Sequence, residues 1–213
     1  MNIKALVVSA ALLISAQANA NFITNGDFQT CNFSGWSLDT DGFGEPADTS
    51  DFSIVDNAGQ CSAMLGTDNL FPDGISNTLF TQLDLSGVAD GVVLDLSFDW
   101  LFSGSDLQTD DFSDAFSVVL NNGIEFELLL FGFESSSGTF TAQLDNSYDG
   151  FFLDFALMPG FNLESFSSTL TVDNVSLVES TDVSAPQTSI LLAFGLGMIA
   201  LRRSHTKKQG MPL

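Results

Sequence analysis

Between residues 21 and 201 the chain contains 27 Asp and Glu side chains but no Lys, Arg or His. The five Lys and Arg lie at the two ends, at Lys4 and between Arg202 and Lys208, so the formal net charge is −22. An unpaired charge is costly to bury. The 21 Phe nevertheless provide too much apolar area for a disordered acidic tail. The chain must therefore fold so that acidic and apolar side chains of the same segment lie on opposite faces.

Several short segments alternate apolar and polar residues, which predicts half-buried β-strands. The clearest is Leu94–Trp100, and similar patterns occur at 124–128, 140–144 and 170–173. Further strands are expected at 22–28, 33–38, 52–55, 61–65, 78–85, 112–120, 150–157 and 174–178. Asn122-Gly123 predicts a hairpin with a type I′ turn. No helical period is present, so about ten short strands indicate one all-β domain over residues 21–178, an antiparallel β-sandwich.

The missing cations exclude several classes of function. A body without Lys or Arg cannot neutralise phosphates, so nucleic-acid binding is not expected. Without His or Lys, the body cannot contain a Ser-His-Asp triad, a Cys-His pair or a Schiff-base lysine. A metal site would have only hard oxygen ligands, which calcium prefers.

The first twenty residues have the pattern of a secretory signal peptide. Lys4 is followed by the apolar stretch 5–16 and then by Ala18-Asn19-Ala20, which matches an A-x-A cleavage site. We therefore expect cleavage between Ala20 and Asn21. In an exported chain, Cys31 and Cys61, which are the only cysteines, are expected to form a disulfide.

The C-terminal end predicts a membrane anchor. A linker at residues 179–186 leads into an apolar segment at 187–201, which is expected to be a short transmembrane helix. The segment 202–213 follows and begins with Arg202-Arg203. Because basic residues favour the cytoplasmic side, the acidic body should lie outside the inner membrane.

Val183-Ser184-Ala185-Pro186, the apolar segment and the terminal basic cluster resemble the PEP-CTERM sorting signal of Gram-negative bacteria. In this chain Ser184, Ala185 and Pro186 stand where the usual Pro-Glu-Pro is found. The resemblance implies recognition by an exosortase, a membrane cysteine transpeptidase, with Arg202 and Arg203 as part of the signal. It also implies cleavage near Pro186 and transfer from the membrane to the cell surface or the medium.

Asn25-Gly26-Asp27-Phe28-Gln29 and Gly35-Trp36 resemble the opening motif of galactose-binding-like jelly rolls, which include carbohydrate-binding modules. Asp173–Leu177 resembles their closing strand. The resemblance implies a jelly-roll-like sandwich in which the first and last strands pair. It also implies a structural calcium ion held by Gln29 and Asp173, where Gln29 replaces the Glu of the family pattern.

Two other acidic clusters are alternative calcium sites. One is Asp39, Asp41, Glu45 and Asp48, which contains a D-x-D-G spacing but lacks the remaining EF-hand ligands. The other is Asp106, Asp110, Asp111 and Asp114. Each cluster can equally be a solvated acidic loop, because the chain is rich in Asp.

Three functions are compatible with these features. The first is a non-enzymatic surface or matrix protein that acts in adhesion or is associated with exopolysaccharide, with divalent cations bridging the acidic body to the matrix. The second is a carbohydrate-binding module with a specific glycan site. The third is a glycosidase that uses a carboxylate pair. Trp36 and Trp100 are expected in the core, which leaves Tyr148 as the expected exposed platform for a sugar.

Overall fold

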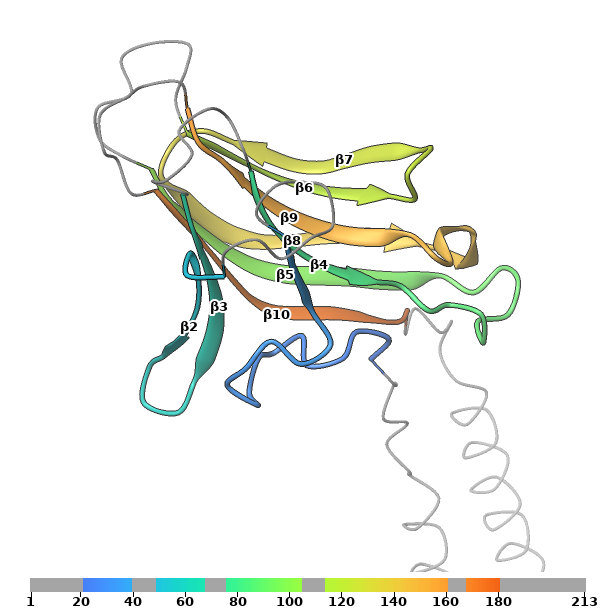
Figure 1. Ribbon diagram of the computed structural model, residues 1–213. Coiled ribbons are helices and arrows are strands. Elements are labelled where there is room, and N and C mark those ends of the chain that lie inside the picture. Colours follow the sequence, from blue (N-terminus) through green and yellow to red (C-terminus); the bar gives the residue numbers. More distant parts are fainter. Residues whose placement is uncertain (1–20, 40–48, 68–75, 105–113, 161–167, 181–213) are drawn as a thin grey trace, which may run out of the picture. The chain divides into compact units, whose positions relative to one another are not determined.

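The computed structural model describes residues 21–39, 49–67, 76–104, 114–160 and 168–180 (Figure 1). The chain divides into two units, Met1–Glu179 and Ser180–Leu213, and the elements below belong to the first. The expected signal peptide, sorting motif, C-terminal helix and basic tail lie outside the described residues. Within the described ranges, no helix has the length and apolar character needed to cross a membrane.

Ten strands form two five-stranded antiparallel sheets in the described part of the chain. The first sheet has the order β1-β4-β9-β6-β7, and the second has the order β2-β3-β10-β5-β8. The strands of the first sheet are β1 (Ser37–Asp39), β4 (Asn77–Gln82), β6 (Ala115–Asn121), β7 (Phe126–Gly132) and β9 (Phe152–Met158). Those of the second sheet are β2 (Phe52–Asp56), β3 (Cys61–Gly66), β5 (Leu94–Ser103), β8 (Ser136–Leu144) and β10 (Thr169–Glu179). One 3-10 turn, η1 (Asn146–Tyr148), joins β8 to β9.

The two sheets pack face to face around an aromatic core. In β5, Leu94, Leu96 and Phe98 are fully buried, and the residues between them point to the other face. Phe98 meets Phe155 of β9 from the opposite sheet with ring centroids 5.0 Å apart. The predicted antiparallel sandwich is confirmed. The alternation at Leu94–Trp100 also predicted correctly which face of β5 is buried.

The segment predicted as a strand at 22–28 is instead a series of turns. Asn25 and Phe28 have positive φ angles of 52° and 50°, which lie outside the extended backbone of a regular strand. The segment still runs beside β10 (Figure 1), because the Phe22 amide donates to the Leu177 carbonyl at 2.8 Å. The predicted strand at 33–38 is also shorter, since β1 begins only at Ser37.

The hairpin predicted at Asn122-Gly123 is present, but its turn is not type I′. Gly123 has a positive φ of 82°, whereas Asn122 does not. The Asn122 Oδ1 atom accepts hydrogen bonds from the amides of Ile124 and Glu125, at 3.0 and 2.8 Å. This side-chain cap lengthens the loop, so β7 begins at Phe126 rather than at Ile124.

Candidate functional site

The outer face of the first sheet is the surface that points away from the second sheet. Phe155 of β9 is fully buried between the sheets, so its neighbour Asp154 points to this outer face. The register of the strands then aligns side chains in three rows that cross the sheet. The rows are Phe126-Asn121-Phe152-Gln82, Leu128-Val119-Asp154-Phe80-Ser37 and Phe131-Ser117-Ala156-Thr78-Asp39.

Aromatic rings lie on this face although strand alternation assigns it to solvent. Phe80 and Phe152 are partly buried neighbours that meet edge to face, with ring centroids 5.7 Å apart. Phe126 and Phe131 on the edge strand β7 are 68% and 52% exposed. The sequence could have predicted that these rings face outward, because Phe80 and Phe152 alternate in phase with the polar residues Gln82 and Asp154 of the same strands.

Asp154 is the carboxylate nearest the centre of the outer face. Its Oδ2 atom accepts a hydrogen bond from the Asn121 side-chain amide. Its Oδ1 atom is buried and has no hydrogen-bond partner. Burial raises the pKa of Asp154 to about 6; the Asn121 hydrogen bond opposes this rise, and the negative charge of Asp39 adds to it. A carboxylate with a free acceptor oxygen therefore lies beside the Phe80–Phe152 pair.

A hollow of about 250 Å³ lies where β7 begins, next to η1. It is lined by Glu125, Phe126, Glu127, Ser147, Tyr148 and Phe151. The Tyr148 hydroxyl donates to Glu127 Oε2 at 2.5 Å, and the Tyr148 ring packs edge to face on Phe151 at 5.2 Å. Tyr148 is therefore a partly buried wall of this hollow and not the exposed platform that the sequence predicted. Trp36 is buried and Trp100 is partly buried against the core, as expected.

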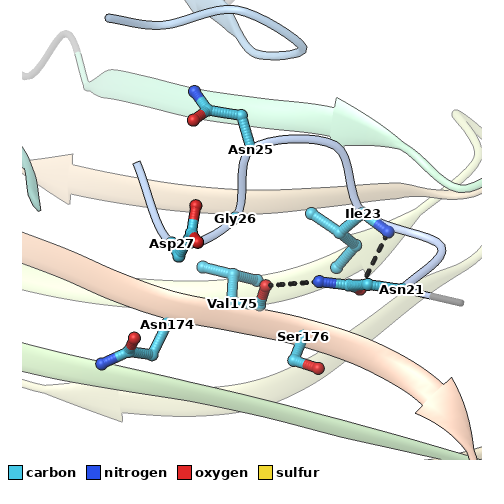
Figure 2. A pocket seen from close by; sticks show the side chains of 8 residues that line it. All are labelled: Asn21, Ile23, Asn25, Gly26, Asp27, Asn174, Val175 and Ser176. Carbon is cyan, nitrogen blue, oxygen red and sulfur yellow. Dashed lines mark hydrogen bonds between the residues drawn. The ribbon is translucent and has the colours of Figure 1, made fainter. Parts of the chain in front are cut away.

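A second hollow, of about 350 Å³, separates the N-terminal segment from β10 (Figure 2). Its lining residues are Asn21, Ile23, Asn25, Gly26, Asp27, Asn174, Val175 and Ser176. The Asn21 side chain crosses between the two segments: its Nδ2 atom donates to the Val175 carbonyl at 3.4 Å, and its Oδ1 atom accepts from the Ile23 amide at 3.1 Å. The expected pairing of the two ends of the domain is therefore made by a loop and one strand.

Each of the two calcium ligands implied for this region makes a hydrogen bond within its own segment. The Gln29 side chain donates to the Asp27 carbonyl at 3.0 Å. Asp173 Oδ1 accepts from the Asn174 amide at 2.7 Å, and burial followed by the charges of Asp99 and Asp27 raises its pKa. Within the described ranges, no group of three or more His, Cys, Asp or Glu is placed to hold a metal ion. Calcium at this end of the domain stays a prediction.

The other predicted clusters are only partly described. Asp39 is a buried residue at the end of β1 on the outer face, whereas Asp41, Glu45 and Asp48 lie outside the described residues. Asp106, Asp110 and Asp111 also lie outside them. Asp114 accepts hydrogen bonds from the Gly160 amide at 2.6 Å and the Ser168 hydroxyl at 2.5 Å, so it fastens two segments together.

The predicted disulfide is present: Cys31 and Cys61 are joined with an S–S distance of 2.02 Å. Cys61 begins β3 and is fully buried, whereas Cys31 lies in the exposed N-terminal loop. The bond therefore ties the loop that precedes β1 to the second sheet.

No family model matches this sequence, and no curated protein matches it. Solved structures with a similar fold include TmCBM61 in complex with β-1,4-galactotriose, at 10% identity and a TM-score of 0.48 over 76% of this chain and 99% of that one. A Family 16 carbohydrate-binding module has 16% identity and a TM-score of 0.44, with 75% and 100% covered. The N-terminal cellulose-binding domain of Cellulomonas fimi β-1,4-glucanase C has 15% identity and a TM-score of 0.42, with 77% and 100% covered. What these structures share with this chain is the β-sandwich fold.

Proposed function

We propose that this chain is a non-catalytic module that binds a polysaccharide on the outer face of its first sheet. The observation that carries the proposal is Asp154, which has an unpartnered Oδ1 atom and is the register neighbour of Phe80 in the aromatic pair Phe80–Phe152. A sugar ring has an apolar face that packs on aromatic rings and hydroxyls that need acceptors and donors. Asp154 is only partly buried and its carboxylate torsion is soft, so rotation can turn the free oxygen toward a ligand.

The other side chains of the face support the same ligand. Gln82 and Asn121 each carry an amide next to Phe152 in the same row. The body has no cation to attract a uronate or a sulfate, so its net charge disfavours anionic glycans. We therefore propose a neutral or cationic polysaccharide.

The cellular location predicted from the sequence is part of the same proposal. A chain that is exported, handled by an exosortase and transferred to the surface meets extracellular polysaccharide rather than cytoplasmic sugars. Adhesion or association with exopolysaccharide would then be a consequence of glycan binding. Divalent-cation bridging of the acidic body, including calcium at the domain ends, remains a further part of this proposal.

Truncation of one aromatic ring tests the outer face. Phe152→Ala is expected to weaken binding of the best neutral polysaccharide from a glycan array about tenfold, equivalent to about 1.4 kcal/mol. The control is Leu101→Ala, which removes a half-exposed apolar side chain from β5 in the second sheet. Affinity electrophoresis or calorimetry provides the comparison, with circular dichroism to confirm that both variants fold.

Equal binding by wild type and Phe152→Ala would contradict the proposal. If the wild-type chain releases new reducing ends from a polysaccharide and Asp154→Asn does not, the chain is a glycosidase instead.

Asp154 also predicts a pH-dependent stability difference. Its pKa is raised from the ordinary 3.8 to about 6 in the folded chain, so ionisation costs folding free energy as pH rises from about 4 to about 6. Asp154→Asn removes this cost. The unfolding free energy of Asp154→Asn relative to wild type should therefore increase between pH 4 and pH 7. The full shift in pKa corresponds to about 3 kcal/mol, and the measured increase should be smaller because the side chain is partly exposed.

Urea unfolding of both chains at several pH values measures this difference. The control is Asp84→Asn, because the hydroxyl and amide of Ser86 lower the pKa of the exposed Asp84. The unfolding free energy of Asp84→Asn relative to wild type should not increase as the pH rises. A constant difference between Asp154→Asn and wild type across this range would contradict the raised pKa.

A further inference from the structure

The hollow beside η1 combines aromatic walls with carboxylates. Phe126 is 68% exposed at its mouth, whereas Phe151 is 7% exposed and the Tyr148 ring packs against it. Glu125 and Glu127 line the same space. Aromatic faces and carboxylates both attract cations, the first through the ring quadrupole and the second through charge.

The charges around this hollow are negative. The pKa of Tyr148 is raised to about 12, first by the hydrogen bond to Glu127, then by burial, and then by the charges of Glu127, Asp145 and Glu125. The same charges that oppose a tyrosinate favour a cation at this place. No Lys, Arg or His occurs between residues 21 and 201, so the body has no side chain of its own to fill that role.

The hollow adjoins the outer face at one residue of β7. Phe126 lines the hollow and also begins the row that continues through Asn121 and Phe152. A volume of about 250 Å³ is below the range of about 300–1,000 Å³ that is typical for drug-sized ligands. It suits a single sugar unit at the end of a longer chain lying on the face.

We propose that this hollow binds an amino-sugar unit, with its ammonium group against Glu125 and Glu127 and its ring against Tyr148, at the place where Phe126 meets the outer face. The inference rests on the proposed function, because the remaining sugars lie on the outer face. N-acetylation removes the charge of the amine, so the acetylated sugar loses the ionic part of this recognition. A polysaccharide with free amines is therefore preferred over its acetylated form.

Calorimetry on the full chain tests this preference with two probes, the hexasaccharide of glucosamine and the hexasaccharide of N-acetylglucosamine. Both titrations contain about 1 M NaCl, at which the Debye length is about 3 Å, so that general attraction to the acidic body is screened. The wild-type chain is expected to bind the amine form at least about tenfold more tightly. Glu127→Gln should remove most of this preference. Glu134→Gln, which changes the charge equally outside the hollow, should keep it.

The outcomes separate this inference from the proposed function. Equal affinity for the two hexasaccharides, or equal loss of preference in Glu127→Gln and Glu134→Gln, overturns the amine site. If neutral polysaccharides on the array still bind and depend on Phe152, the outer-face proposal stands. If no glycan of any kind binds, both proposals are overturned. Tyr148→Phe keeps the ring and removes the hydrogen bond to Glu127, so it should retain the preference if Glu127 acts through its charge.

Discussion

Gly26→Ala is expected to lower the free energy of unfolding by about 3 kcal/mol or more. A Cβ atom on Gly26 would lie 1.9 Å from the Val175 carbonyl oxygen and 2.9 Å from its carbon. The contact is with backbone, which cannot rotate away as a flexible side chain would. The Gly26 carbonyl also accepts from the Val175 amide at 2.8 Å, so moving the two segments apart breaks that hydrogen bond. The close approach of the N-terminal segment to β10 (Figure 2) therefore depends on glycine at this position.

The control for this prediction is Gly87→Ala. A Cβ atom on Gly87 would have no neighbour within 4 Å, and its φ lies outside the left-handed region. Its unfolding free energy should stay within about 0.5 kcal/mol of wild type. Urea denaturation of the three chains gives the comparison, and soluble yield gives a second measure if Gly26→Ala does not fold. Similar stability of both variants would contradict the close approach of Gly26 to β10.

The core of the sandwich could be predicted because local pattern and tertiary packing agree there. Leu94, Leu96 and Phe98 alternate with polar residues in the sequence, and the pleat of β5 places them all between the sheets. The same agreement holds in β9, where Leu153, Phe155 and Leu157 are buried. Alternation is a local property, so it can be read without knowing which strands pair.

The N-terminal segment could not be predicted because its conformation depends on a distant strand. Phe22, Ile23 and Phe28 give it the apolar content of a strand, but its long-range hydrogen bonds are made to β10, about 150 residues later in the chain. One cue was present in the sequence. The Asn25-Gly26 pair favours turns, and Asn25 takes the positive φ that such residues tolerate.

The candidate site could not be predicted because it is made by strand register. Asp154 lies between Phe80 and Val119 only because β9 pairs with β4 on one side and β6 on the other. Those partners come from distant parts of the sequence, and a shift of one residue would exchange the two faces. Alternation alone therefore identifies the outward residues of each strand but not their neighbours across the sheet.

Breaking the Cys31–Cys61 disulfide is the second change expected to have a large effect. The bond closes a loop with a sequence separation of 30 residues, so its loss should lower the free energy of unfolding by about 3–4 kcal/mol on the chain-entropy model. The location of the bond adds to the expected effect. It joins the exposed N-terminal loop to the buried start of β3, where the Gln29 side chain also donates to the Cys61 carbonyl at 3.4 Å.

Reduction of the wild-type chain tests this prediction without creating a cavity at the buried Cys61. The melting temperature in excess dithiothreitol should fall clearly below that of the oxidised chain, with mass spectrometry showing two free thiols. The double variant Cys31→Ala, Cys61→Ala should melt at the same temperature with and without dithiothreitol, which separates loss of the bond from any general effect of the reagent. An unchanged melting temperature in the fully reduced wild type would mean that the loop is held by its hydrogen bonds to β10, from Phe22 and Gly26, rather than by the disulfide.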